Sequence, residues 1–117
     1  MDKILIINND DDTMSLLKIW FERRSYKVKY TSSGENIPQL MKEFEPKVVL
    51  IDIIQKDAAI EIKNNKETCD IPVILMTGYT SRHTPLEVMV DDTIEKPFDM
   101  QLLERKIDRL IDLASLK

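Results

Sequence analysis

Polar residues that could take part in chemistry stand at the ends of several apolar runs in this sequence. Asp52 ends the run "VVLI", Thr77 ends "IPVILM", and Lys96 follows "TIE". The first apolar run, "ILII", is followed by the polar string "NNDDD". A carboxylate is costly to bury unless it is paired, hydrogen-bonded or kept near water. A carboxylate, a hydroxyl and an ammonium group at one place would suit phosphoryl transfer, which depends mainly on positioning and charge neutralisation.

Strand-like and helix-like segments alternate along the whole chain and must position these residues. The first apolar run is continuous and β-branched, as in a strand covered on both faces, whereas "YKVKYT" alternates in polarity like an edge strand. The expected strands are 4–7, 26–31, 47–54, 71–77 and 93–95. The expected helices lie within 10–24, 32–44, 58–65 and 84–90, with a last helix from Asp99 onward. This alternation predicts an α/β fold: a five-stranded parallel sheet with helices on both faces.

Helical spacing of apolar residues predicts which helix faces cover the sheet. In the first helix these residues are Leu16, Leu17, Trp20 and Phe21. In the last helix they are Leu103, Ile107, Leu110, Ile111 and Ala114. Both sets are therefore expected in the core.

The carboxyl ends of parallel strands form the rim at which open α/β sheets bind ligands. We therefore expect Asp52, Thr77 and Lys96 at one rim. Each residue alone has a plainer explanation. An aspartate at a strand end is often a turn residue, a threonine after a strand often reflects β-propensity, and a lysine before proline is usually solvated. Their joint placement at three strand ends favours a site.

Length, charge and composition limit the classes of protein to which this chain can belong. A length of 117 residues suits a single domain, 1–117. The net charge of −4 provides no basic footprint for direct nucleic acid binding. Cys69 is the only cysteine, so no internal disulfide can form, and a reducing cytoplasm is the expected location. The apolar run near the N-terminus is too short for a signal peptide or a membrane span.

Four stretches resemble the receiver domain of two-component response regulators: "KILIINNDDDTMSLLK", "PKVVLIDII", "IPVILMTGY" and "DDTIEKPFD". The resemblance covers essentially the whole chain and implies the CheY-like, flavodoxin-like fold with strand order 2-1-3-4-5. It further implies that Asp52 is the phosphoacceptor, that the Thr77 hydroxyl reorients towards the phosphoryl group, and that Lys96 contacts the phosphate. The bond from Lys96 to Pro97 would be cis.

The partner that this resemblance implies is a sensor histidine kinase or phosphotransfer protein, with an output domain or a second copy as further partners. No enzyme activity is implied beyond Mg²⁺-assisted self-phosphorylation and dephosphorylation at Asp52.

This sequence departs from the family where the family holds its divalent ion. Receivers usually carry two acidic residues after the first strand, and Asn8 and Asn9 stand there instead. An amide oxygen can coordinate Mg²⁺ but brings no charge, and each lost carboxylate removes on the order of a few kcal/mol of attraction. The remaining ligands would be Asp52, Asn9, Asp10 and the backbone carbonyl of Ile54. We therefore expect Mg²⁺ to bind weakly or not at all.

Other departures bear on switching. Thr93 occupies the position of the family's switching aromatic, and Asp91 and Asp92 are expected to form a solvated loop. Without a bound ion, Lys96 should pair directly with Asp52.

Three functions stay open at this point. The first is a phosphorylated, atypical receiver with a weakened metal site. The second is a degenerate pseudo-receiver that acts by protein–protein contact without phosphorylation. A flavodoxin-like nucleotide or flavin binder is disfavoured, because neither Gly34 nor Gly78 follows the first strand to form a phosphate loop. A hydrolase triad is also poorly supported, because His83 is the only histidine and sits in a polar loop.

Overall fold

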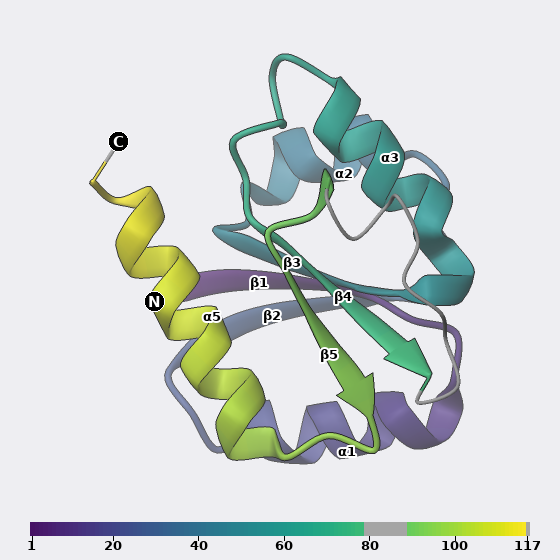
Figure 1. Cartoon of the computed structure of the whole chain (residues 1–117), viewed down its shortest axis with the longest axis vertical. Helices are drawn as coiled ribbons and strands as arrows, with labels where there is room; N and C mark the ends of the chain where they lie inside the picture. Colours follow the sequence, from purple (N-terminus) through teal and green to yellow (C-terminus); the bar gives the residue numbers. More distant parts are fainter. Residues whose placement is uncertain (79–88, 117) are drawn as a thin grey trace.

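The computed structural model describes residues 1–78 and 89–116, and its centre is one sheet of five parallel strands (Figure 1). The strands stand in the order β2-β1-β3-β4-β5, as the sequence predicted. Their bounds are Asp2–Ile7 (β1), Tyr26–Thr31 (β2), Val48–Asp52 (β3), Val73–Gly78 (β4) and Asp92–Lys96 (β5). The helices are Asp11–Glu22 (α1), Ile37–Phe44 (α2), Lys56–Asn64 (α3) and Met100–Ala114 (α5), with a 3₁₀ turn η1 at Ile53–Gln55.

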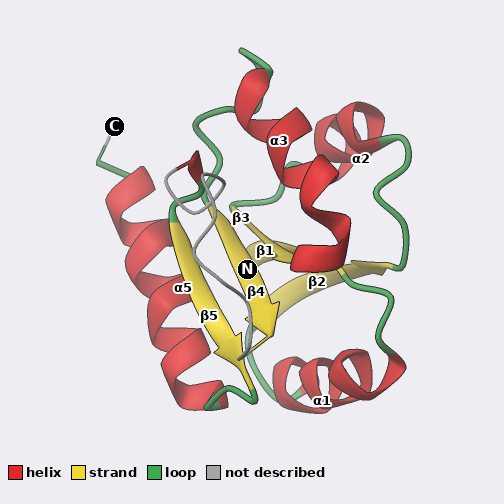
Figure 2. Cartoon of the chain, turned by 45° about the vertical axis from the view of Figure 1, so that its right-hand side comes forward, coloured by secondary structure: helices red, strands yellow, loops and turns green. Residues whose placement is uncertain are grey.

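The helices cover both faces of the sheet in two layers. Helices α1 and α5 lie on one face and α2 and α3 on the other (Figure 2). Side chains of successive strand residues point to opposite faces. Leu50 and Ile74 therefore pack with α1 and α5, while Ile51 and Leu75 pack with α2 and α3. This alternation fixes which rim residues share a face.

Two of the predicted helix faces need correction. In α1, Leu17 and Phe21 are buried as expected, but Leu16 is 46% exposed and points away from the sheet. A helix that packs on a sheet buries a stripe about 100° wide, and on α1 this stripe runs through Leu17 and Phe21, so Leu16 falls outside it. In α5, four of the five predicted residues are buried, and Ala114 is half-buried at the last turn.

Several element boundaries also differ from the prediction. Strand β3 ends at Asp52 rather than continuing to 54, because Ile53 and Ile54 already belong to the turn η1. That turn runs directly into α3, which consequently begins two residues before the predicted 58. Strand β4 begins at Val73 rather than 71. The helix predicted at 84–90 falls largely outside the described residues, as does His83.

The prediction of a solvated loop at 91–92 is only partly right: Asp91 lies in a bend and is exposed, but Asp92 is half-buried and begins β5. The Nζ atom of Lys63, a residue of α3, lies 2.5 Å from Oδ2 of Asp91 and donates to the backbone carbonyls of Cys69 and Ile71. The same Asp91 oxygen accepts from the backbone N–H of Val73 at 2.8 Å. The Lys63 side chain is only 8% exposed. One buried ammonium group therefore ties α3 to the residues that precede both β4 and β5.

A second polar network joins α1 and β2 to α5. Glu104 accepts hydrogen bonds from Trp20 Nε1 at 2.9 Å, from Arg24 Nε at 2.7 Å and from the Tyr26 hydroxyl at 3.3 Å. The guanidinium carbon of Arg24 lies 3.6 Å from the centre of the Trp20 ring. Burial acts to raise the pKa of Glu104, but these hydrogen bonds outweigh it and hold the pKa below its usual value. The network fixes α5 beside α1.

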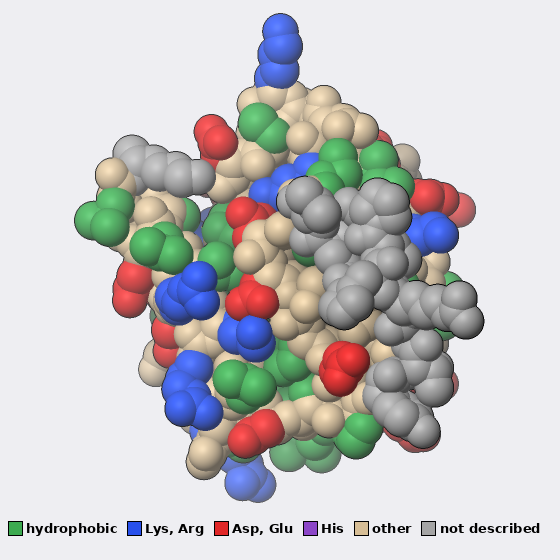
Figure 3. Space-filling model, in the orientation of Figure 1, with side chains coloured by type: hydrophobic (Ala, Val, Ile, Leu, Met, Phe, Trp, Pro, Cys, Tyr) green, Lys and Arg blue, Asp and Glu red, His purple; other side chains and the backbone are tan. Residues whose placement is uncertain are grey.

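The visible surface carries mixed charge. Acidic and basic side chains are interspersed over the face shown in Figure 3, in keeping with the small net charge of the chain. Among the described residues, no helix combines the length and apolar character needed to cross a bilayer.

Candidate functional site

The centre of the candidate site is a direct ion pair between Asp52 and Lys96. Asp52 is the last residue of β3 and is 1% exposed, and Lys96 is the last residue of β5. Nζ of Lys96 lies 2.9 Å from Oδ2 of Asp52, while Oδ1 accepts from the backbone N–H of Ile54 at 3.2 Å. Both carboxylate oxygens are thus occupied. The ion pair expected from the sequence is confirmed.

Strand register explains why these two side chains meet. Asp52 and Lys96 alternate in step with Leu50 and Ile94, which face α1 and α5. Both polar residues therefore project to the same side of the sheet, one residue beyond the buried core. Strand β4 lies between β3 and β5, so only a side chain as long as lysine can cover the distance between them.

Thr77 reaches the same rim but takes the other face. It is 4% exposed and alternates with Val73 and Leu75, which pack against α2 and α3. Its hydroxyl donates to the backbone carbonyl of Ile94 at 3.5 Å, a distance at the limit for such a bond. The three predicted residues therefore share one rim, but only Asp52 and Lys96 are in direct contact.

Asp10, the residue that caps α1, also belongs to the cluster. Its Oδ2 lies 3.8 Å from Nζ of Lys96 and accepts from the Thr13 hydroxyl at 2.5 Å. Its Oδ1 accepts from the backbone N–H of Asp12 and so caps α1. The Thr13 hydrogen bond, supported by Asp12 and Lys96, holds the pKa of Asp10 below its usual value. Asp10 is therefore a charged helix cap whose oxygens already have donors.

The two asparagines have different environments. Asn9 is exposed, whereas Asn8 is 1% exposed. The β1–β3 register pairs Ile7 with Ile51, so its continuation sets Asn8 beside Asp52. Oδ1 of Asn8 accepts from the backbone N–H of Asp10 at 2.8 Å, but its buried Nδ2 has no hydrogen-bond partner in the described part of the chain. Sequence reasoning chose Asn9 and missed Asn8, although the alternation of strand residues could have identified it.

The carboxylates nearest to the rim already have partners. Mg²⁺ binds through carboxylate oxygens and water, in octahedral geometry. The Asp52 carboxylate is paired with Lys96, and the Asp10 carboxylate caps α1. Asn8 brings no charge and turns its carbonyl oxygen to a backbone donor. Within 1–78 and 89–116, no three acidic, histidine or cysteine side chains are placed to hold one metal ion.

A shallow apolar hollow lies next to the ion pair. Leu16 from α1 and Pro97 and Phe98 from the turn before α5 line it, together with Asp10, Asp12, Thr13 and Lys96. The bond from Lys96 to Pro97 is cis, as the family resemblance implied. Exposed Leu16 therefore lines this hollow beside Lys96 instead of packing in the core.

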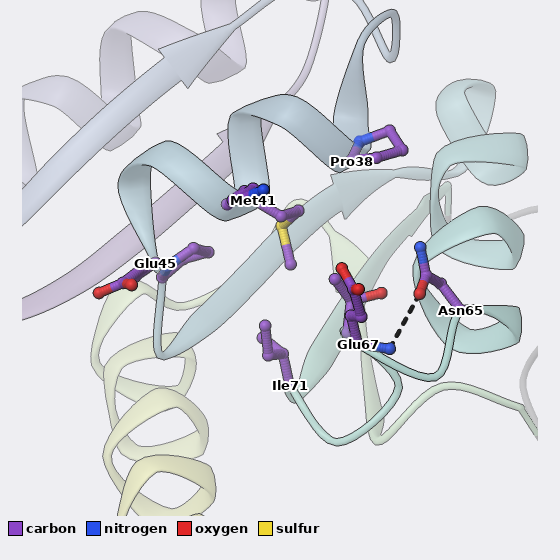
Figure 4. Close-up of a pocket in the computed structure, with 9 residues that line it drawn as sticks. Pro38, Met41, Glu45, Asn65, Glu67 and Ile71 are labelled. Atoms are coloured by element: carbon purple, nitrogen blue, oxygen red, sulfur yellow. Dashed lines mark hydrogen bonds between the residues drawn. The ribbon is translucent and has the colours of Figure 1, made fainter.

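A second hollow belongs to the opposite end of the sheet. It lies between α2 and the loop that leads from α3 to β4, and Figure 4 shows the side chains of Met41 and Ile71 facing one another across it. The backbone N–H of Glu67 donates to Oδ1 of Asn65 at 2.9 Å along its edge. None of the rim residues lines this hollow, so it is not part of the site.

Comparison with known proteins defines the class to which this fold and site belong. The family model described as the response regulator receiver domain matches residues 4–108. The chain therefore belongs to the receiver domain family of two-component response regulators.

Individual relatives agree with this assignment. The chain is 29% identical over 124 residues to the regulatory protein AtoC of Escherichia coli, covering 100% of this chain and 27% of AtoC. It is 29% identical over 119 residues to the response regulator SaeR of Staphylococcus aureus, covering 95% of this chain and 51% of SaeR. The chain thus spans about half or less of these relatives. The crystal structure of TrrA from Thermotoga maritima, a complex with Mg²⁺ and beryllofluoride, shares the fold with a TM-score of 0.81 at 24% identity, over 94% of this chain and 99% of that one.

Proposed function

We propose that Asp52 is the phosphoacceptor of this receiver domain. The observation that carries the proposal is the buried Asp52 carboxylate at the sheet rim, oriented by the Ile54 N–H and neutralised by Lys96. A carboxylate oxygen of Asp52 would attack the phosphorus of a phosphohistidine. The P–N bond then breaks, and the imidazole nitrogen keeps the electron pair and takes up a proton. Lys96 offsets the charge of the transferred group. The domain turns over no separate substrate.

We propose that Mg²⁺ binds this site weakly, because few charged ligands are free to hold it. The carboxylates of Asp52 and Asp10 are engaged, and the acidic pair typical of the family is replaced by Asn8 and Asn9. The other ligands available to Mg²⁺ are neutral oxygens, including the backbone carbonyl of Ile54. Phosphorylation is then slow compared with that of a receiver that has a full acidic set.

The partner we propose is a sensor histidine kinase or a phosphotransfer protein. The hollow bordered by Leu16, Pro97 and Phe98 offers an apolar contact immediately beside Lys96, the residue paired with Asp52. Ile19, one turn further along α1, is 58% exposed and extends this surface. A partner helix laid along α1 could thus present a phosphohistidine to Asp52. Since the relatives are longer than this chain, an output domain is a further proposed partner.

Acetyl phosphate with intact-mass spectrometry tests the acceptor. We expect one added phosphoryl group in wild type and none in Asp52→Ala. Asp11→Ala, a change at an exposed acid on the same loop, serves as the matched control and should retain the added mass. Absence of any phosphoryl adduct in wild type under prolonged incubation would contradict this assignment.

The second candidate function is a pseudo-receiver that works by contact alone. The observation in its favour is that Lys96 already occupies Asp52, while the hydroxyl of Thr77 is directed to Ile94 of β5. Such a domain would bind its partner equally well before and after treatment with acetyl phosphate. Equal affinity of wild type and Asp52→Ala for the partner would favour this function.

A further inference from the structure

The amide nitrogen of Asn8 is a buried donor for which the function described so far has no use. Its Nδ2 has less than 1 Å² of accessible surface and no partner among the described residues. The orientation of the amide is fixed, because its oxygen accepts from the Asp10 N–H at 2.8 Å. A buried polar group without a partner is destabilising. A buried donor without a partner calls for an explanation, and one is an acceptor that arrives during function.

The position of Asn8 indicates which acceptor would arrive. The β1–β3 register sets it beside Asp52, on the face of the sheet that also carries Lys96. A group attached to Oδ of Asp52 would thus meet a neutral donor from the residue after β1 and a cationic donor from β5. Both are donors, and both suit an oxyanion rather than a cation.

The charges around Asp52 also favour binding of an oxyanion. Asn8 contributes no negative charge at a position adjacent to Asp52, so it does not repel a dianionic group there. Asp10 does carry charge, but its oxygens face the α1 N-terminus and Lys96. The pocket beside Asp52 therefore needs less neutralisation by a bound cation than a pocket lined by carboxylates would.

We infer that Asn8 Nδ2 and Lys96 Nζ together bind a phosphoryl-class oxyanion on Asp52 without a divalent cation. The inference rests on the proposed function in one respect, that Asp52 is the residue carrying the group. Asn8 takes the place of a metal ligand and donates directly to the anion.

Beryllofluoride binding, followed by ¹⁹F NMR with EDTA or with Mg²⁺, tests this inference. Wild type should bind beryllofluoride in EDTA, with an affinity within about threefold of that in Mg²⁺. Asn8→Asp keeps the acceptor for the Asp10 N–H, so the fold is preserved, but it replaces the donor by a carboxylate oxygen. Its affinity in EDTA should fall by roughly tenfold or more, the range expected for one hydrogen bond to a charged group. Added Mg²⁺ should restore most of that loss.

Asn64→Asp is the matched control, because it makes the same change at an exposed position at the end of α3. It should bind beryllofluoride in EDTA as wild type does. A wild type that binds only with Mg²⁺, or an Asn8→Asp variant that binds equally well in EDTA, overturns the inference. The latter result would mean that Nδ2 serves only a structural water.

The two experiments distinguish failure of the phosphoacceptor role from failure of the cation-free anion site. If acetyl phosphate leaves Asp52 unmodified while beryllofluoride binds in EDTA, the anion site stands and the phosphoacceptor role fails. If Asp52 is phosphorylated only with Mg²⁺, the phosphoacceptor role stands and the cation-free site fails.

Discussion

Removing Lys96 should destabilise the domain mainly because it leaves the Asp52 carboxylate buried and unpaired. At the observed separation of 2.9 Å, the attraction is about 6 kcal/mol at an effective dielectric of about 20. The loss of hydration of a buried carboxylate offsets several kcal/mol of this. Since Lys96 keeps 24% of its side chain exposed, we expect Lys96→Met to cost about 3 kcal/mol.

Asp52→Asn should cost less, about 1 kcal/mol or below, because Lys96 retains water and Asp10 at 3.8 Å. The amide also keeps an oxygen for the Ile54 N–H. In the double variant the unpaired carboxylate is gone, so Asp52→Asn should recover about 2 kcal/mol of the Lys96→Met loss. Urea denaturation of the four proteins measures these free energies of unfolding.

Additivity would refute the reasoning. If the coupling free energy between the two substitutions is below about 0.5 kcal/mol, the contact between Lys96 and Asp52 does not contribute measurably to the free energy of unfolding. A Lys96→Met variant as stable as wild type would contradict the burial of charge at Asp52.

Three further predictions concern other contacts. Lys63→Met should lower the free energy of unfolding by about 3 kcal/mol in urea, more than Asp91→Asn does, because the lysine is 8% exposed and the aspartate 34%; equal losses would contradict this. The pKa of Glu104 is lowered in the folded state, so its contribution is present above the usual carboxyl pKa and is lost as pH falls through the folded-state value. The free energy of unfolding of wild type, measured in urea, should therefore fall on acidification by on the order of 0.5 kcal/mol more than that of Glu104→Gln, since this group is partly exposed. Parallel curves would rule the effect out. Thr77→Val should change stability by no more than about 1 kcal/mol by thermal denaturation, because its hydroxyl bond of 3.5 Å is long; a larger loss would show that the hydroxyl is tightly held.

The fold could be predicted because strand and helix periodicities are strong here. Continuous β-branched runs indicated the buried strands, and the alternating "YKVKYT" indicated the edge strand β2. The end of β3 could not be placed so well. Ile53 and Ile54 have strand-like side chains, yet the Asp52 carboxylate accepts from the Ile54 N–H and starts a turn. A local side-chain hydrogen bond there overrides intrinsic propensity.

The site was predictable in part. The placement of Asp52 and Lys96 followed from strand ends and the rule for open sheets. The choice between Asn8 and Asn9 depended on which residue continues the strand alternation, and the one chosen proved to be exposed. The Lys63–Asp91 contact joins residues far apart in sequence, and no local pattern marks such a pair.

The most direct test of the account is the rate at which acetyl phosphate modifies Asp52 as Mg²⁺ is varied. Wild type and the Asn8→Asp, Asn9→Asp double variant should be compared by intact mass from EDTA to millimolar Mg²⁺. We predict a wild-type rate that changes by less than about threefold, and a double-variant rate that rises roughly tenfold or more as the carboxylates recruit the ion. A wild-type rate that is negligible in EDTA and saturates at low Mg²⁺ would contradict the account.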